Sequence, residues 1–105
     1  MSKPSRREQL EAMLADDPND PLLRYMLAME HVSAGTPAEA VPVFRELLER
    51  SPDYVPAYMQ FGQTLARLGQ SAEARAVWQR GVAQARQQRD DHAAGEMQGM
   101  IDMLE

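Results

Sequence analysis

Apolar residues recur every three or four positions along most of this chain, which is the spacing of amphipathic helices. The pattern is interrupted at Pro18, Gly35, Pro52 and Gly69. Proline lacks the N–H that a helix interior needs, and glycine adopts the positive φ that often ends a helix. We therefore predict six helices, joined by short connections that make neighbours antiparallel. They span about residues 5–16, 20–34, 37–50, 54–68, 71–88 and 91–104.

Residues that cap helices occur where these boundaries are expected. Ser5 with Glu8, and Thr36 with Glu39, have the S/T-x-x-E pattern of a capping box, in which each side chain bonds a backbone N–H of the other. Short polar residues also favour the start of a helix. We expect them to start three further helices, at Asp20, Asp53 and Ser71.

The chain matches itself when it is shifted by 34 residues. Small residues, large apolar residues and helix breakers then fall on residues of the same kind. The pairs are Pro18 with Pro52, Leu27 with Phe61, Ala28 with Gly62, Gly35 with Gly69, Glu39 with Glu73, Ala40 with Ala74 and Phe44 with Trp78. Small residues allow two helices to approach closely, and a ring fills the space between hairpins. A repeat of this length predicts stacked helical hairpins.

These paired residues resemble those of the tetratricopeptide repeat (TPR) family over about residues 19–86, together with Tyr58 and Leu65 in the second hairpin. The resemblance implies an all-α fold, a right-handed α-solenoid of antiparallel helical hairpins with about six helices. We expect one domain over residues 1–105. It consists of an N-terminal half-repeat over 5–18, repeats over 19–52 and 53–87, and a capping helix over 90–105.

Some residues differ in kind from the residue 34 positions away. These pairs are Arg24 with Tyr58, His31 with Leu65, and Gly81 with Leu47. We expect the first two differences to leave the packing of the first hairpin incomplete. Gly81 is expected to weaken its helix by up to about 1 kcal/mol relative to alanine. Pro42, beyond the first turn of its helix, is expected to bend it.

Composition excludes several classes of function. The chain has 105 residues, of which 44% are hydrophobic and 26% charged, and a formal net charge of −5. An acidic chain is a poor match for nucleic acid or an anionic membrane surface, because both attract clustered cations. The chain has no cysteine, hence no disulfide and no cysteine-type zinc site. Residues 1–7 are polar and no apolar run approaches about 20 residues, so we expect a cytoplasmic protein without signal peptide or membrane span.

Groups that could carry catalysis do not converge in the sequence. His31 falls on a packing position of its helix and is interpreted as a structural histidine. His92 and Glu96 are four residues apart and form a surface pair, because two ligands do not make a metal site. No phosphate-binding glycine motif occurs. We therefore expect no enzymatic activity, no metal and no cofactor.

The resemblance implies that the first helix of each hairpin lines a concave groove that binds a peptide or helix of a partner protein. The expected groove residues are Leu22, Tyr25, Met26, Met29, Met59, Gln60, Gln63 and Arg67. Helix 20–34 is apolar over most of its circumference, so it should be covered on both sides. Three occupants stay open: the chain's own core around Met26 and Met29, an apolar or amphipathic partner segment, and a second copy of the chain as a homodimer.

Some TPR proteins clamp the C-terminal carboxylate of chaperone tails with lysine, asparagine and arginine side chains. By the resemblance, the matching residues here are Tyr25, Met29, Gln60, Asp90 and Ala94. None is basic, and Asp90 would repel a carboxylate. We therefore reject a role in binding chaperone tails.

Charge is divided along the C-terminal part of the chain. Residues 64–89 carry five arginines against Glu73, a net charge of +4, and residues 90–105 carry five acids and no cation, a net charge of −5. We expect the acidic helix to pack beside the basic one, through an apolar stripe formed by Met97, Met100, Ile101 and Leu104. The alternatives are an acidic partner at Arg67, Arg75 and Arg80, or self-association through a displaced last helix.

Overall fold

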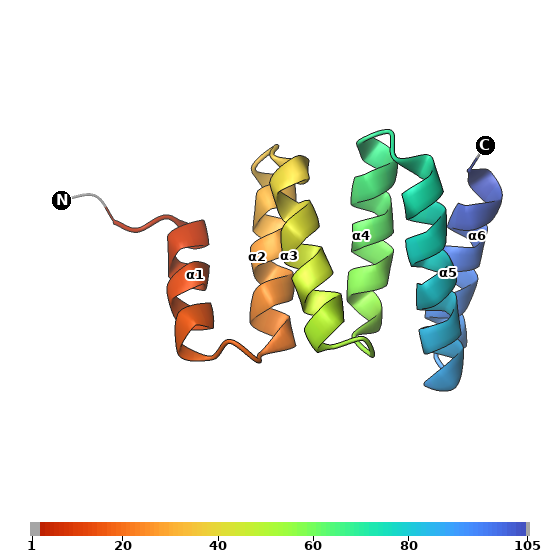
Figure 1. The fold of residues 1–105 in the computed structure, drawn as a ribbon, viewed down its shortest axis with the longest axis horizontal. Coiled ribbons are helices and arrows are strands. Elements are labelled where there is room, and N and C mark those ends of the chain that lie inside the picture. The colour runs from red at the N-terminus through yellow and green to blue at the C-terminus, as the bar shows by residue number, and fades with distance from the viewer. Residues whose placement is uncertain (1–2, 105) are drawn as a thin grey trace. The chain divides into compact units, whose positions relative to one another are not determined.

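A computed structural model describes residues 3–104 of the chain. Residues 1, 2 and 105 lie outside this range, and they include the start of the polar N-terminal segment and the last acidic residue. In the described part, six helices and no strand are present (Figure 1). They are α1 (Arg6–Asp16), α2 (Pro21–Ser33), α3 (Pro37–Arg50), α4 (Val55–Arg67), α5 (Ser71–Gln87) and α6 (Asp91–Met103). Each boundary lies within about one residue of its prediction, because capping residues and helix breakers act locally. The predicted fold class is confirmed.

The chain divides into two compact units, the first ending at Ser51 and the second beginning at Pro52. In the first unit, α2 packs against both α1 and α3. In the second unit, α5 packs against both α4 and α6, and α4 makes a smaller contact with α6. The predicted placement of an acidic α6 beside a basic α5 is therefore confirmed.

The expectation that Arg24 would leave the packing of the first unit incomplete is wrong. It is 5% exposed, its Nη1 donates to the carbonyl of Pro18 (2.7 Å), and its Nε lies 3.6 Å from a Glu46 carboxylate oxygen. The buried apolar residues of the first unit are Leu10, Leu27, Ala28, Ala40, Phe44, Leu47 and Leu48. A buried guanidinium is tolerated when its donors are paired. No buried side-chain polar atom in the described residues lacks a partner.

Tyr58 in the second unit donates to a backbone carbonyl equivalent to the one that Arg24 bonds in the first. Its hydroxyl donates to the carbonyl of Pro52 (2.6 Å), and Pro52 is the residue 34 positions after Pro18. The guanidinium of Arg80 lies 5.5 Å from the centre of the Tyr58 ring, within range of a cation–π contact. Burial raises the pKa of Tyr58, and the nearby charge of Arg80 lowers it in part.

Two glycines in the second unit allow close approach between helices. A Cβ on Gly62 would lie 2.2 Å from Nε1 of Trp78, the atom that donates to the backbone carbonyl of Met59 (3.2 Å). A Cβ on Gly81 would lie 2.5 Å from Sδ of Met97 and 2.6 Å from Cβ of Tyr58. Gly81 therefore has a packing role that the sequence comparison with Leu47 did not predict.

The three tight turns between antiparallel helices share one backbone pattern. In each, a residue with positive φ follows the helix, and the next N–H donates to a carbonyl near the helix end. The donor and acceptor pairs are Thr36 with His31 (3.0 Å), Gln70 with Leu65 (2.8 Å) and Asp90 with Ala85 (2.8 Å). Gly35 (φ 81) and Gly69 (φ 80) were expected in this role, but Arg89 (φ 59) was not.

The predicted caps are confirmed in part. Ser5 and Glu8 form the complete capping box, and Asp20 accepts from the N–H of Leu22 (2.9 Å). The second capping box is wrong, because the Thr36 hydroxyl donates instead to the carbonyl of His31 (3.0 Å). Asp53 and Ser71 do not cap their helices either, since α4 and α5 begin after Tyr54 and Gln70 without a side-chain cap. Helix α3 runs through Pro42 without interruption.

Candidate functional site

The predicted residues of α2 form a half-exposed apolar face on the first unit. Leu22 is 52% exposed, and Tyr25, Met26 and Met29 are half-buried. The opposite side of α2 carries the buried Leu27 and Ala28. Within this unit, Met26 and Met29 are therefore only partly covered.

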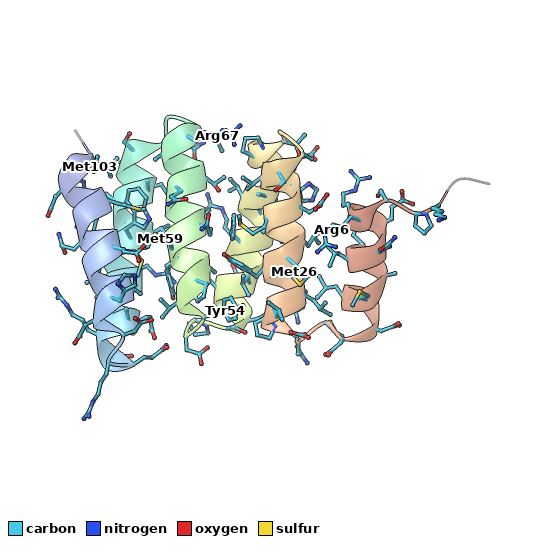
Figure 2. The ribbon with its side chains drawn as sticks, turned by 180° about the vertical axis from the view of Figure 1, so that it is seen from behind. Arg6, Met26, Tyr54, Met59, Arg67 and Met103 are labelled. Atoms are coloured by element: carbon cyan, nitrogen blue, oxygen red, sulfur yellow. The ribbon has the colours of Figure 1, made fainter. Side chains whose placement is uncertain are left out.

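Helix α1 contributes a charged residue to this face. Tyr25, Met26, Met29, Ser33, Glu30 and Arg6 line a shallow hollow of about 220 Å³. The Nε atom of Arg6 lies 3.5 Å from a carboxylate oxygen of Glu30, and Arg6 reaches from α1 toward α2 (Figure 2). Sequence analysis missed Arg6, because the helix face that α1 turns toward α2 depends on packing.

The predicted residues of α4 lie on the second unit and are more polar. Met59 and Gln60 are half-buried, whereas Gln63 and Arg67 are exposed. The two predicted sets thus belong to different units, and a single groove that contains both stays a prediction.

An apolar cleft of about 350 Å³ lies beside the α4 residues. Its lining comes from three helices, with Gln63 and Ala66 on α4, Trp78 on α5, and Met100, Met103 and Leu104 at the end of α6. Nε2 of Gln63 lies 3.7 Å from Sδ of Met100, which ties α4 to α6 across the cleft. Met103 is 83% exposed. Of the predicted α6 stripe, Met97 and Ile101 are buried, whereas Met100 and Leu104 are half-buried at the cleft.

A second exposed side of α6, away from the cleft, carries polar and small residues. Tyr58, Phe61 and Leu65 are buried in α4, but the residues 34 positions later are the exposed His92, Gly95 and Gly99. A Cβ on either of these glycines would meet no atom within 4 Å. This side of α6 therefore offers no apolar surface to a further helix, as expected of a helix that faces solvent.

Arginines of the second unit keep their charges free of ion pairs with α6. In residues 3–104, no acid of α6 lies within ion-pair distance of Arg67, Arg75, Arg80 or Arg86. The predicted mutual neutralisation of α5 and α6 therefore has no direct ion pair behind it in these residues and stays a prediction.

Neither histidine lies in a cluster that resembles a catalytic or metal site. Nδ1 of His31 lies 3.4 Å from a carboxylate oxygen of Glu39, and the His31 side chain is 13% exposed, in keeping with its structural interpretation. His92 contacts Glu96 on the surface of α6. No group of three potential metal-ligating side chains occurs among the described residues. No helix within residues 3–104 has the length and apolar character needed to cross a membrane.

A family model for the tetratricopeptide repeat matches residues 31–96, more than half of the chain. The chain belongs to the TPR family. A TPR repeat-containing protein from Pseudomonas aeruginosa is 32% identical over 90 residues, which cover 86% of each chain.

Solved structures agree with this assignment. A protein from Bordetella parapertussis is 32% identical and has a TM-score of 0.80, with 95% of this TPR chain and 87% of that chain covered. The crystal structure of a tetratricopeptide repeat domain protein from Salinibacter ruber is 33% identical with a TM-score of 0.73, covering 78% and 91%. These relatives are bacterial, which supports a bacterial origin. TPR proteins generally mediate protein–protein interactions and are generally non-enzymatic scaffolds.

Proposed function

We propose that this TPR protein is a cytoplasmic adaptor that binds an apolar or amphipathic segment of a partner protein. The interaction surface consists of the predicted residues of α2 and α4: Leu22, Tyr25, Met26, Met29, Met59, Gln60, Gln63 and Arg67. The repeats over 19–52 and 53–87 present these two helices, between the half-repeat and the capping helix.

The partly exposed apolar face of α2 carries the proposal. Leu22, Met26 and Met29 leave apolar surface exposed although α2 has a well-formed buried side of its own. Exposed apolar patches on a folded unit mark interaction sites more often than accidents of packing. Methionine adapts its shape to varied apolar ligands, so it suits a surface that accepts a partner side chain.

A foreign partner fits this surface better than a second copy does. The chain carries a net charge of −5, so two copies repel each other at long range. Nucleic acids and anionic membranes are negatively charged, so the same net charge disfavours them as partners.

The test is affinity capture from a lysate of the source bacterium, with the wild-type chain compared with the double variant Met29→Glu/Met59→Glu. A carboxylate at either position would have to lose water when the partner binds, so the variant should release the partner. The control is Met13→Glu, because Met13 is 51% exposed on α1 and outside the proposed surface. All three chains must show equal helicity by circular dichroism.

One protein held by the wild type and by Met13→Glu, and lost by the double variant, would support the proposal and identify the partner. Equal capture by all three chains would contradict it. A dimeric mass in light scattering that the double variant abolishes would replace the adaptor with a self-associating module.

A further inference from the structure

Residues from two helix stripes line the cleft of the second unit. Met59, Gln63 and Ala66 on α4, and Glu96, Met100 and Met103 on α6, each follow the i, i+4, i+7 spacing of one helix face. Gln63, Ala66, Met100 and Met103 line the cleft, and Gln63 contacts Met100 across it. We call the space between the two stripes the α4–α6 trough.

The trough has a charge of opposite sign at each end. Arg67 follows Ala66 at the end of α4, and Figure 2 shows it at the same end of the unit as Met103. Glu96 lies one helical turn before Met100, and so at the other end. In the described residues Arg67 has no ion pair, and the one ion pair of Glu96 is with His92, whose side chain is 87% exposed.

The middle of the trough has an apolar floor and one side chain, Gln63, that can bond the main chain of a ligand. Trp78 and Met100 line the floor, and Gln63 projects from α4 with a thioether as its only bonding partner in the described residues. A thioether is a weak acceptor, so the carboxamide of Gln63 keeps its capacity to bond a peptide group. An extended chain offers free peptide groups, whereas a helix has already used its own.

We propose that the α4–α6 trough binds an extended segment of a partner in which one apolar side chain lies between a basic and an acidic residue. The apolar side chain occupies the cleft above Trp78, the basic residue lies at Glu96, and the acidic residue lies at Arg67. This inference rests on the proposed function, because Met59, Gln63 and Arg67 belong to the same interaction surface. It adds the chemistry and the orientation of the ligand.

The dimensions of the trough set the length of the segment. Glu96 and Met103 are seven positions apart in α6, which corresponds to about 10 Å at about 1.5 Å per residue. An extended chain covers this distance in about three residues, at about 3.3 Å each. The opposite charges of the ligand should therefore be about three to four positions apart along its chain, with the apolar residue between them.

The experiment uses three synthetic peptides with the same centre, a leucine between two glycines, and blocked termini. The first has lysine at one end and glutamate at the other, the second has lysine at both ends, and the third has glutamate at both ends. Binding to the full chain is followed by NMR of methionine methyl groups labelled with ¹³C. Met100 and Met103 report on the trough, Met26 and Met29 on the α2 face, and the buried Met97 and Met13 of the first unit serve as internal controls.

The mixed-charge peptide should bind most tightly, by about threefold over either uniform peptide, which is the scale of one exposed ion pair. Its binding should shift the methyl signals of Met100 and Met103 and leave that of Met13 unchanged. Arg67→Glu should move the preference to the lysine peptide, and Glu96→Lys should move it to the glutamate peptide. The double variant Arg67→Glu/Glu96→Lys should restore the preference for the mixed peptide, bound in the reverse direction.

Two charge changes outside the trough are the matched controls. Arg86→Glu and Asp102→Lys alter exposed charges of the same sign on α5 and on another side of α6, and should leave the ranking unchanged. Equal binding of the three peptides, or a ranking that Arg86→Glu shifts as strongly as Arg67→Glu does, would overturn the inference. Concentration-dependent shifts of Met100 and Met103 without peptide would also overturn it, because a second copy would then occupy the trough.

The two proposals fail separately. A failure of the peptides at the trough leaves the capture experiment with Met29→Glu/Met59→Glu unaffected, because that experiment detects a native partner on the wider surface. Loss of the adaptor function would appear as equal capture by all chains, even if the mixed-charge peptide bound.

Discussion

The α2–α3 and α4–α5 hairpins have the same 34-residue spacing but different chemistry at equivalent positions. Arg24 and Tyr58 both donate to the carbonyl of a proline six residues earlier, over 2.7 Å and 2.6 Å. In the first unit, Arg50 supports the same carbonyl with a longer bond (3.4 Å) and also bonds Asn19. The repeat thus requires a buried donor for this carbonyl and does not require an aromatic ring.

The two hairpins also differ in the residues that fill the space between their helices. Ala28 and Phe44 in the first unit correspond to Gly62 and Trp78 in the second, so the larger ring occurs with the smaller partner. Leu47 corresponds to Gly81, and the space of its side chain is taken by Met97 of α6. At these positions a smaller residue in one unit is thus accompanied by a larger neighbour, as close-packed interiors demand.

The largest effect is expected for Gly81→Leu, which gives the second unit the residue of the first. A Cβ at this position would overlap Met97 and Tyr58, so α6 would have to move away from α5. We expect a loss of about 3 kcal/mol or more in the free energy of unfolding, measured in urea. The control is Gly99→Leu, where a Cβ meets no atom and the leucine should stabilise α6 by about 0.5 to 1 kcal/mol. Equal stability of the two variants would contradict the packing role of Gly81.

A smaller loss is expected for Gly62→Ala, which copies Ala28 into the second unit. Its Cβ would overlap the Trp78 ring, and such overpacking destabilises by about 1 to 3 kcal/mol. Adding Trp78→Phe recreates the Ala28 and Phe44 pair and should recover part of the loss. Urea unfolding of both single variants and the double variant measures this coupling. Strictly additive losses would show that the two residues do not compensate each other.

The smallest effect is expected for Tyr58→Phe, which removes one hydrogen bond and should cost about 1 kcal/mol near neutral pH. Burial raises the pKa of Tyr58, so the folded chain keeps a proton that the unfolded chain releases. The contribution is fully present below the unfolded pKa of 10.0 and is lost as the pH rises through the folded pKa. Unfolding in urea at about pH 8 and about pH 11 should therefore show the wild type losing its advantage over Tyr58→Phe. An advantage that persists at the higher pH would contradict this account.

Local signals explain why the helices could be predicted from the sequence. Gly35 and Gly69 adopt the positive φ expected of them, and Ser5 forms its capping box with Glu8. Thr36 has the same capping pattern, but the tight turn before it places the carbonyl of His31 within reach, and the hydroxyl donates there instead. A pattern of residue types does not reveal such a competing acceptor.

Contacts between helices account for what the sequence did not predict. Arg24 looked out of place because one of its partners, Glu46, lies on α3 and is near Arg24 only through the packing of α2 against α3. At the candidate site, the faces of α2 and α4 followed from the repeat register. Arg6 on α1 and Met103 on α6 did not, because the side that a terminal helix presents depends on how it docks against its neighbours.

The turn between α5 and α6 has a consequence for the molecular evolution of this protein. Arg89 adopts a φ of 59, where the other two turns have glycine, and a side chain in this conformation costs roughly 1 kcal/mol or more. Every arginine codon is a single nucleotide away from a glycine codon. A more stable form of the protein therefore lies one point mutation from the present gene, so its stability is below the maximum that this fold and this sequence can reach.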